Sequence, residues 1–318
     1  MRNRISAIVL TLAFASFFAV AARAGSFSFT TGSPDGKLGA ASRPDGSPGP
    51  ETETADDFVL TQATVVSGAT IHGLIPTGSP ISSISRVEVE IYHVFANDSD
   101  VSRTSGSPTF STVNVPTRVN SPADVEIDAA TRDSNGSTLR FIASPISDFE
   151  VQNTVIDGIN KVPLQLTHGE GPARGEQVEI RITFKEPLFL PAGHYFFRPE
   201  VEVSSGNFLF LSAPRPITSG TPFPAGTTDL QAWIRNTNLK PDWLRIGGDI
   251  VGAGTFNMTF SLTGNTVPRA GTPGQANCHG QTVSAMAAQF RGIDASASTL
   301  GYSSPAALQE GIRVFCER

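Results

Sequence analysis

Two tryptophans and two arginines form the clearest group of residues that could do chemistry. Gln231, Trp233 and Arg235 alternate along DLQAWIR (229–235), and Trp243 and Arg245 share one parity of DWLRI (242–246). Because successive side chains of a strand point to opposite faces, these residues share a polar face while the intervening apolar residues face the core. A flat aromatic ring beside hydrogen-bonding side chains suits a sugar ring.

The predicted ligand site therefore comprises Gln231, Trp233, Arg235, Asp242, Trp243 and Arg245. In this hypothesis the tryptophans stack on sugar rings and the arginines bond hydroxyls or carboxylates. The alternative interpretation is that long loops cover both tryptophans and that the arginines pair locally.

Acidic residues offer a second, weaker candidate. Asp98 and Asp100 follow a predicted strand and carry the oxygen ligands that Ca²⁺ prefers, but no EF-hand spacing follows them. The alternative is a pair of solvated loop acids or an Asx-turn. We therefore predict no metal ligands beyond these two weak Ca²⁺ candidates, and no other cofactor.

Catalytic motifs are missing from the sequence. It holds no G-x-S-x-G elbow, Walker loop, G-x-G-x-x-G or H-E-x-x-H. Glycosidases need two carboxylates brought together in space, and the glutamates of the predicted strands mostly alternate outward, so no pair can be nominated. The sequence gives no positive case for an enzyme.

The elements that position these residues are mainly strands. Arg86–Phe95, Gln177–Phe184 and Phe256–Leu262 alternate between apolar and polar residues, which predicts one core face and one solvent face. Charged residues make up only 16% of the chain, which also has 30 glycines and 23 prolines. These features predict an antiparallel two-sheet β-sandwich of jelly-roll type, in which Ser26–Thr30 pairs with Phe256–Leu262.

A small helical module is predicted after the sandwich. The sandwich spans 25–263, a Gly/Pro-rich linker spans 264–276, and 277–318 contains helical patterns, one of which starts at Ser304-Pro305. Cys278 and Cys316 bracket this module, and we expect a disulfide between them. A metal site from Cys278, His279 and Cys316 is the alternative, but it has one ligand too few.

The first 24 residues predict export. Arg2 and Arg4 precede an apolar run, and Ala22-Arg23-Ala24 is a small-x-small cleavage pattern, so 1–24 is interpreted as a signal peptide. We expect a periplasmic or extracellular protein without a transmembrane segment in its mature chain. The net charge of −6 without a basic run argues against a nucleic-acid partner. The sequence does not indicate the oligomeric state.

Four segments carry a family resemblance: TADDFVL (54–60), EIYHVFANDSDVSRTSG (90–106), LPAGHYFFRPEV (190–201) and DLQAWIRNTNLKPDWLRIGGDIVG (229–252). In these the chain resembles a family of uncharacterised secreted bacterial β-sandwich proteins. The tail from Asn277 to Cys316 resembles a small Cys-bounded helical module attached to some of them. The resemblance implies the fold and carries no activity.

The function predicted from the sequence is non-catalytic binding or surface association, with a saccharide or cell-surface partner. Two alternatives stay open: a polysaccharide-active hydrolase or lyase on a jelly-roll scaffold, and a structural envelope or matrix protein. A groove with two close carboxylates would favour the hydrolase, whereas an exposed aromatic face would favour binding.

Overall fold

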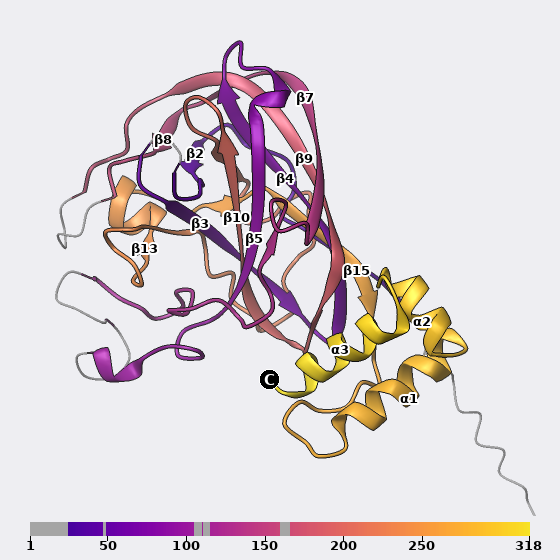
Figure 1. The fold of residues 1–318 in the computed structure, drawn as a ribbon. Helices are drawn as coiled ribbons and strands as arrows, with labels where there is room; N and C mark the ends of the chain where they lie inside the picture. The colour runs from indigo at the N-terminus through magenta and orange to yellow at the C-terminus, as the bar shows by residue number, and fades with distance from the viewer. Residues whose placement is uncertain (1–24, 47–48, 105–109, 111–114, 160–165) are drawn as a thin grey trace, which may run out of the picture.

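Two β-sheets pack face to face in the computed structural model of the chain (Figure 1). The structure describes residues 25–46, 49–104, 110, 115–159 and 166–318. The segment predicted to be a signal peptide, 1–24, lies outside the described residues. Among the helices of the described part, none is long and apolar enough to cross a membrane.

The larger sheet has the strand order β1-β15-β4-β11-β2-β8; β9 also pairs with β4, β7 pairs with β9, and β14 pairs with β11. Its strands are β1 (Ser26–Thr30), β2 (Leu38–Ala41), β4 (Thr64–Pro76), β7 (Leu139–Val151), β8 (Asn153–Val155), β9 (Ala173–Leu190), β11 (Leu209–Ala213), β14 (Asn257–Met258) and β15 (Phe260–Thr266). Strand β1 lies antiparallel to β15, with Phe29 opposite Leu262, which confirms the predicted closure of the sandwich. The one parallel pair among the described strands is β2–β8.

The smaller sheet carries the candidate site and has the order β13-β12-β3-β10-β5-β6. Its strands are β3 (Thr52–Leu60), β5 (Ile84–His93), β6 (Arg132–Asp133), β10 (Gly193–Val203), β12 (Trp233–Asn236) and β13 (Leu244–Arg245). A π-helical turn, Ile246–Val251, follows β13, and 3-10 turns lie at Ile81–Ser83 and Val101–Arg103.

The alternation along β5 sets the two faces of the smaller sheet. Val87, Val89 and Ile91 are buried in the core between the sheets, as predicted. The opposite parity carries Glu88, Glu90 and Tyr92. We predicted that this outer face would be wet, and this was wrong in part, because Tyr92 is 1% and Glu90 8% exposed.

A long connection covers the outer face. Residues 115–128, which we call the covering segment, run back along the end of β5: the Ala123 N–H donates to the His93 carbonyl, and the Ile127 N–H donates to the Ile91 carbonyl. Alternation along a strand separates its two faces, but it does not show which distant loop will cover one of them.

Three helices follow the sandwich: α1 (Cys278–Phe290), α2 (Ile293–Leu300) and α3 (Pro305–Cys316). They lie together at one end of the sheets (Figure 1). Ser304 caps α3 by accepting a hydrogen bond from the Ala307 N–H (3.1 Å), as its sequence predicted. The Cys278–Cys316 disulfide is present, which confirms that prediction.

The helical module shares its core with the sandwich. The Phe315 ring of α3 stacks on Phe189 of β9 with centroids 4.0 Å apart. The segment predicted to be a linker, 264–276, begins inside β15, and its Val267 is fully buried in this same core. The start of this segment, 264–267, is therefore packed structure and the sandwich extends past residue 263, whereas most of 268–276 is exposed.

Candidate functional site

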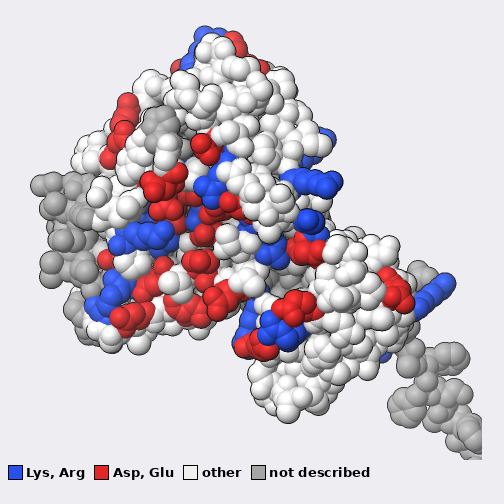
Figure 2. Space-filling view, in the orientation of Figure 1, with Lys and Arg blue, Asp and Glu red and all other residues white. Residues whose placement is uncertain are grey.

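A network of charged side chains lies on the outer face of the smaller sheet. Figure 2 shows acidic and basic residues gathered over this region, with much of the surrounding surface uncharged. The register explains the gathering, because Arg198 lies opposite Glu90, Glu200 lies opposite Glu88, and Arg235 lies opposite Glu53. Neighbouring strands thus place opposite and like charges side by side on one face.

Arg198 is at the centre of this network. Its guanidinium lies 2.7 Å from Glu200, 3.1 Å from Glu53 and 3.6 Å from Glu88, and it also contacts Glu90. Both Arg198 and Glu53 are 1% exposed. Burial opposes the charged form of Arg198, but the surrounding carboxylates outweigh it and raise the pKa of this arginine well above its usual value.

The tryptophans of the predicted sugar platform are buried. Trp233 is 1% and Trp243 0% exposed, and they pack with Tyr92 and Phe196 on the outer face of the sheet. The Trp243 indole N–H donates to the Ala123 carbonyl of the covering segment (3.1 Å). The parity prediction was correct for the tryptophans and for Ala232 and Ile234, but not for Leu230, which packs with the tryptophans. The exposed platform was wrong, and the alternative of loop-covered tryptophans is what the structure shows.

The predicted polar partners are also engaged within the protein. Arg235 forms an ion pair with Glu53, and its guanidinium lies 4.2 Å from the Trp243 ring centroid. Arg245 pairs with Asp249 at 2.6 Å, and Asp242 lies 3.4 Å from Arg103.

Gln231 has a positive φ of 65°, and its buried side-chain carbonyl has no hydrogen-bond donor among the described residues. The six predicted residues therefore belong to packed and ion-paired structure and form no exposed sugar site.

Asp98 and Asp100, the weak Ca²⁺ candidates, each have protein partners. Asp98 contacts the imidazole of His93. The Asp100 carboxylate accepts from the Ser102 N–H (3.0 Å), which caps the turn at Val101–Arg103. This is the Asx-type turn that was the alternative interpretation.

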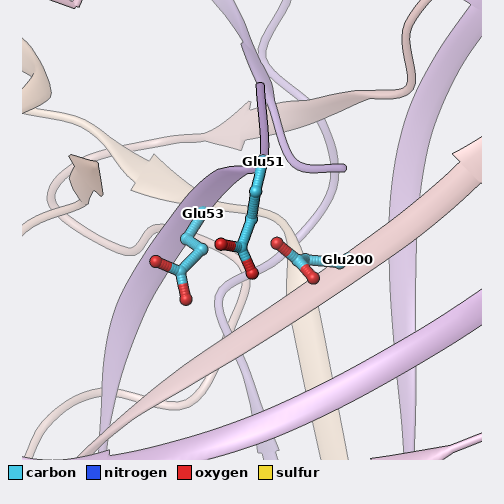
Figure 3. Close-up of side chains that lie close together, drawn as sticks. All are labelled: Glu51, Glu53 and Glu200. Atoms are coloured by element: carbon cyan, nitrogen blue, oxygen red, sulfur yellow. The ribbon is translucent and has the colours of Figure 1, made fainter. Parts of the chain in front are cut away.

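The carboxylates that do converge are Glu51, Glu53 and Glu200. They are the one group of three potential metal-ligating side chains found in the described part of the chain, and one ligand atom of each lies within 4.8 Å of the others. In Figure 3 the Glu51 carboxylate lies between those of Glu53 and Glu200. Glu53 and Glu200 are 1% exposed, whereas the Glu51 side chain is 20% exposed.

The environments of Glu53 and Glu200 shift their pKa values in opposite directions. Burial raises the pKa of Glu200 to about 8, although Arg198 acts against it. Burial also acts to raise the pKa of Glu53, but Arg235 and Arg198 outweigh it and hold this pKa at about 2. Glu200 is therefore the group of this site that changes charge near neutral pH.

Sequence reasoning missed these three residues. Glu200 was one of the strand glutamates, most of which were expected at outward surface positions, and Glu51 and Glu53 were not considered. The sequence did contain a signal for the charged network. The outward positions of two strands are occupied by charged residues: Glu88, Glu90, Arg198 and Glu200. The missing information was that β3 pairs with β10, which brings Glu53 to Arg198.

Comparison of the chain with known protein families, with curated proteins and with solved structures found no match. The family resemblance of the four segments therefore stays a prediction.

Proposed function

We propose that this protein is an exported, non-catalytic binding protein that holds Ca²⁺ at Glu51, Glu53 and Glu200. The observation that carries the proposal is the convergence of these carboxylates, whose ligand atoms lie within 4.8 Å of one another. Ca²⁺ takes oxygen ligands at about 2.3–2.6 Å, so two ligands on opposite sides of one ion are about 5 Å apart.

An unpartnered oxygen supports a ligand at this position. Glu200 Oε1 is buried and has no hydrogen-bond donor among the described residues, although Arg198 lies 2.7 Å from Oε2 of the same carboxylate. Leaving a buried polar atom unpaired costs about 1–3 kcal/mol, and more when the group is charged. A cation beside Oε1 would offset that cost.

The charge balance also favours a divalent cation. Among the described residues, the ion-paired network joins six carboxylates to four cationic side chains, which leaves an excess of two negative charges once Glu200 has lost its proton. Its members are Glu51, Glu53, Glu88, Glu90, Asp133, Glu200, Arg86, Arg198, Arg235 and Lys240. Ca²⁺ fits better than Mg²⁺, which demands near-ideal octahedral geometry and gives up its water reluctantly.

Burial argues against a hydrolase at the same residues. Two close carboxylates with opposed pKa shifts are what general acid and base catalysis uses. However, Glu53 and Glu200 are 1% exposed, so a glycosidic bond has no access to them, whereas an ion can approach along the partly exposed Glu51. The Cys278–Cys316 disulfide supports export, because such bonds persist in oxidising compartments.

Calorimetric titration of the metal-stripped protein with Ca²⁺ and with Mg²⁺ tests the proposal. We expect one Ca²⁺ per chain, with weaker Mg²⁺ binding. Glu51→Gln should weaken Ca²⁺ binding about tenfold or more, because it removes one charged ligand while sparing the buried pairs of Arg198.

The matched control is Glu150→Gln, which changes an exposed glutamate on β7 and should leave the affinity unchanged. Absence of Ca²⁺ binding to the native chain, or equal affinity in Glu51→Gln, would refute the proposal.

A further inference from the structure

A cavity lies where the helical module meets the sandwich. It has a volume of about 310 Å³ and is walled by the end of β9, by α3 and by the segment around Arg132. Its apolar lining includes Pro187, Leu188, Phe189, Ala307 and Val314. This site is separate from the proposed Ca²⁺ site and does not depend on it.

Two guanidinium groups, those of Arg132 and Arg318, line this largely apolar cavity without a direct ion pair. Carboxylates lie near enough to act on them at longer range: Glu186 on Arg132, and Asp98 and Asp128 on Arg318. Within the described residues, no carboxylate oxygen lies within 4.0 Å of Arg132 or Arg318 in an ion pair. Arg132 donates instead to the backbone carbonyls of Glu186 and Ala129, both at 2.8 Å. Nε and Nη1 of Arg318 are buried and have no hydrogen-bond acceptor among the described residues.

Burial disfavours the charged form of both arginines, and the nearby carboxylates offset this only in part. Burial and the neighbouring Arg318 lower the pKa of Arg132 to about 10, and burial likewise lowers the pKa of Arg318. Two half-buried like charges are stabilised by an anion that accepts from both. The fork of donors on each guanidinium matches the two oxygens of a carboxylate.

We propose that this cavity binds a small carboxylic acid with an apolar body. Its carboxylate would accept from the free Nε and Nη1 of Arg318 and lie beside Arg132, and its apolar part would contact Leu188, Phe189 and Val314. A monoanion fits better than a phosphate dianion, because Glu186 and Glu310 also line the cavity and would repel the second charge.

Titration of the full chain with octanoate tests this site, with octanol and inorganic phosphate as comparison probes. We expect saturable octanoate binding that is weakened about tenfold or more in Arg318→Gln, because a charge-assisted hydrogen bond contributes about 1.5–3 kcal/mol. Arg318 lies outside the helices, and the hydrogen bond from its Nη2 to the Asp128 carbonyl is long (3.4 Å) and exposed, so this variant should fold.

The control is Arg140→Gln, which removes an exposed arginine of β7 and should bind octanoate as the native chain does. The proposal is overturned by any of three results: no saturable octanoate binding, unchanged affinity in Arg318→Gln, or octanol or phosphate binding as tightly as octanoate.

Discussion

At the scale of single residues, Glu200 determines how the candidate site responds to pH. Burial raises its folded-state pKa from 4.5 to about 8, so the folded protein holds a proton that the unfolded chain loses at lower pH. The stability that Glu200 contributes is therefore fully present below pH 4.5 and is lost as the pH rises through about 8.

The glutamine variant Glu200→Gln should remove this pH dependence. Without the ionisable group, we expect the unfolding free energy of the variant to fall less than that of the native chain between pH 5 and pH 9. The quantity to compare is the change of the unfolding free energy with pH. The absolute values differ in any case, because the variant also weakens a contact to Arg198 and starts from a lower stability. Urea unfolding in EDTA measures both slopes, and equal slopes would contradict the assignment of Glu200.

At the scale of elements, two helical glycines make a matched pair. A Cβ on Gly311 of α3 would lie 2.7 Å from the Tyr302 hydroxyl, whereas a Cβ on Gly280 of α1 would meet nothing within 4 Å. Alanine is favoured over glycine in a helix by up to about 1 kcal/mol. Glycine at position 311 therefore lowers the stability of α3 but leaves space for the Tyr302 ring at the cavity wall.

Replacing each glycine with alanine should shift stability in opposite directions. We expect Gly280→Ala to raise the unfolding free energy by about 0.5–1 kcal/mol and Gly311→Ala to lower it, because the Tyr302 ring must move. Scanning calorimetry of the two variants beside the native chain provides the measurement. A stabilised Gly311→Ala would show that Tyr302 does not depend on this close approach.

The strands show how far local sequence patterns determine structure. Period-two alternation predicted which residues of β5 and β9 face the core, and it placed Trp233 and Arg235 together on the other face, as found. It could not predict that this face is covered, because the cover comes from residues 115–128, which are far from Trp243 in the chain. The candidate site was missed for the same reason, since Glu53 reaches Arg198 only through the pairing of β3 with β10.

At the scale of the whole molecule, the sandwich and the helical module form one packed body. Phe189 and Val65 of the sandwich share a core with Met286 and Phe315 of the helices, and the disulfide ties the start of α1 to the end of α3. The sequence predicted the module and its disulfide correctly. It placed a linker over 264–276 because Gly and Pro usually mark loops, whereas 264–266 belong to β15 and Val267 is buried.

The central claim is that Glu51, Glu53 and Glu200 hold a calcium ion, and proton release on binding tests it most directly. Near pH 7 most Glu200 carries a proton in the folded protein, and Ca²⁺ must displace it. Calorimetric titrations in HEPES and in Tris, which differ in ionisation enthalpy, count the released protons. We predict release of about one proton per Ca²⁺ from the native chain and none from Glu200→Gln. Equal enthalpies of Ca²⁺ binding in HEPES and in Tris, or no Ca²⁺ binding at all, would contradict the claim that Glu200 is a ligand of a bound calcium ion.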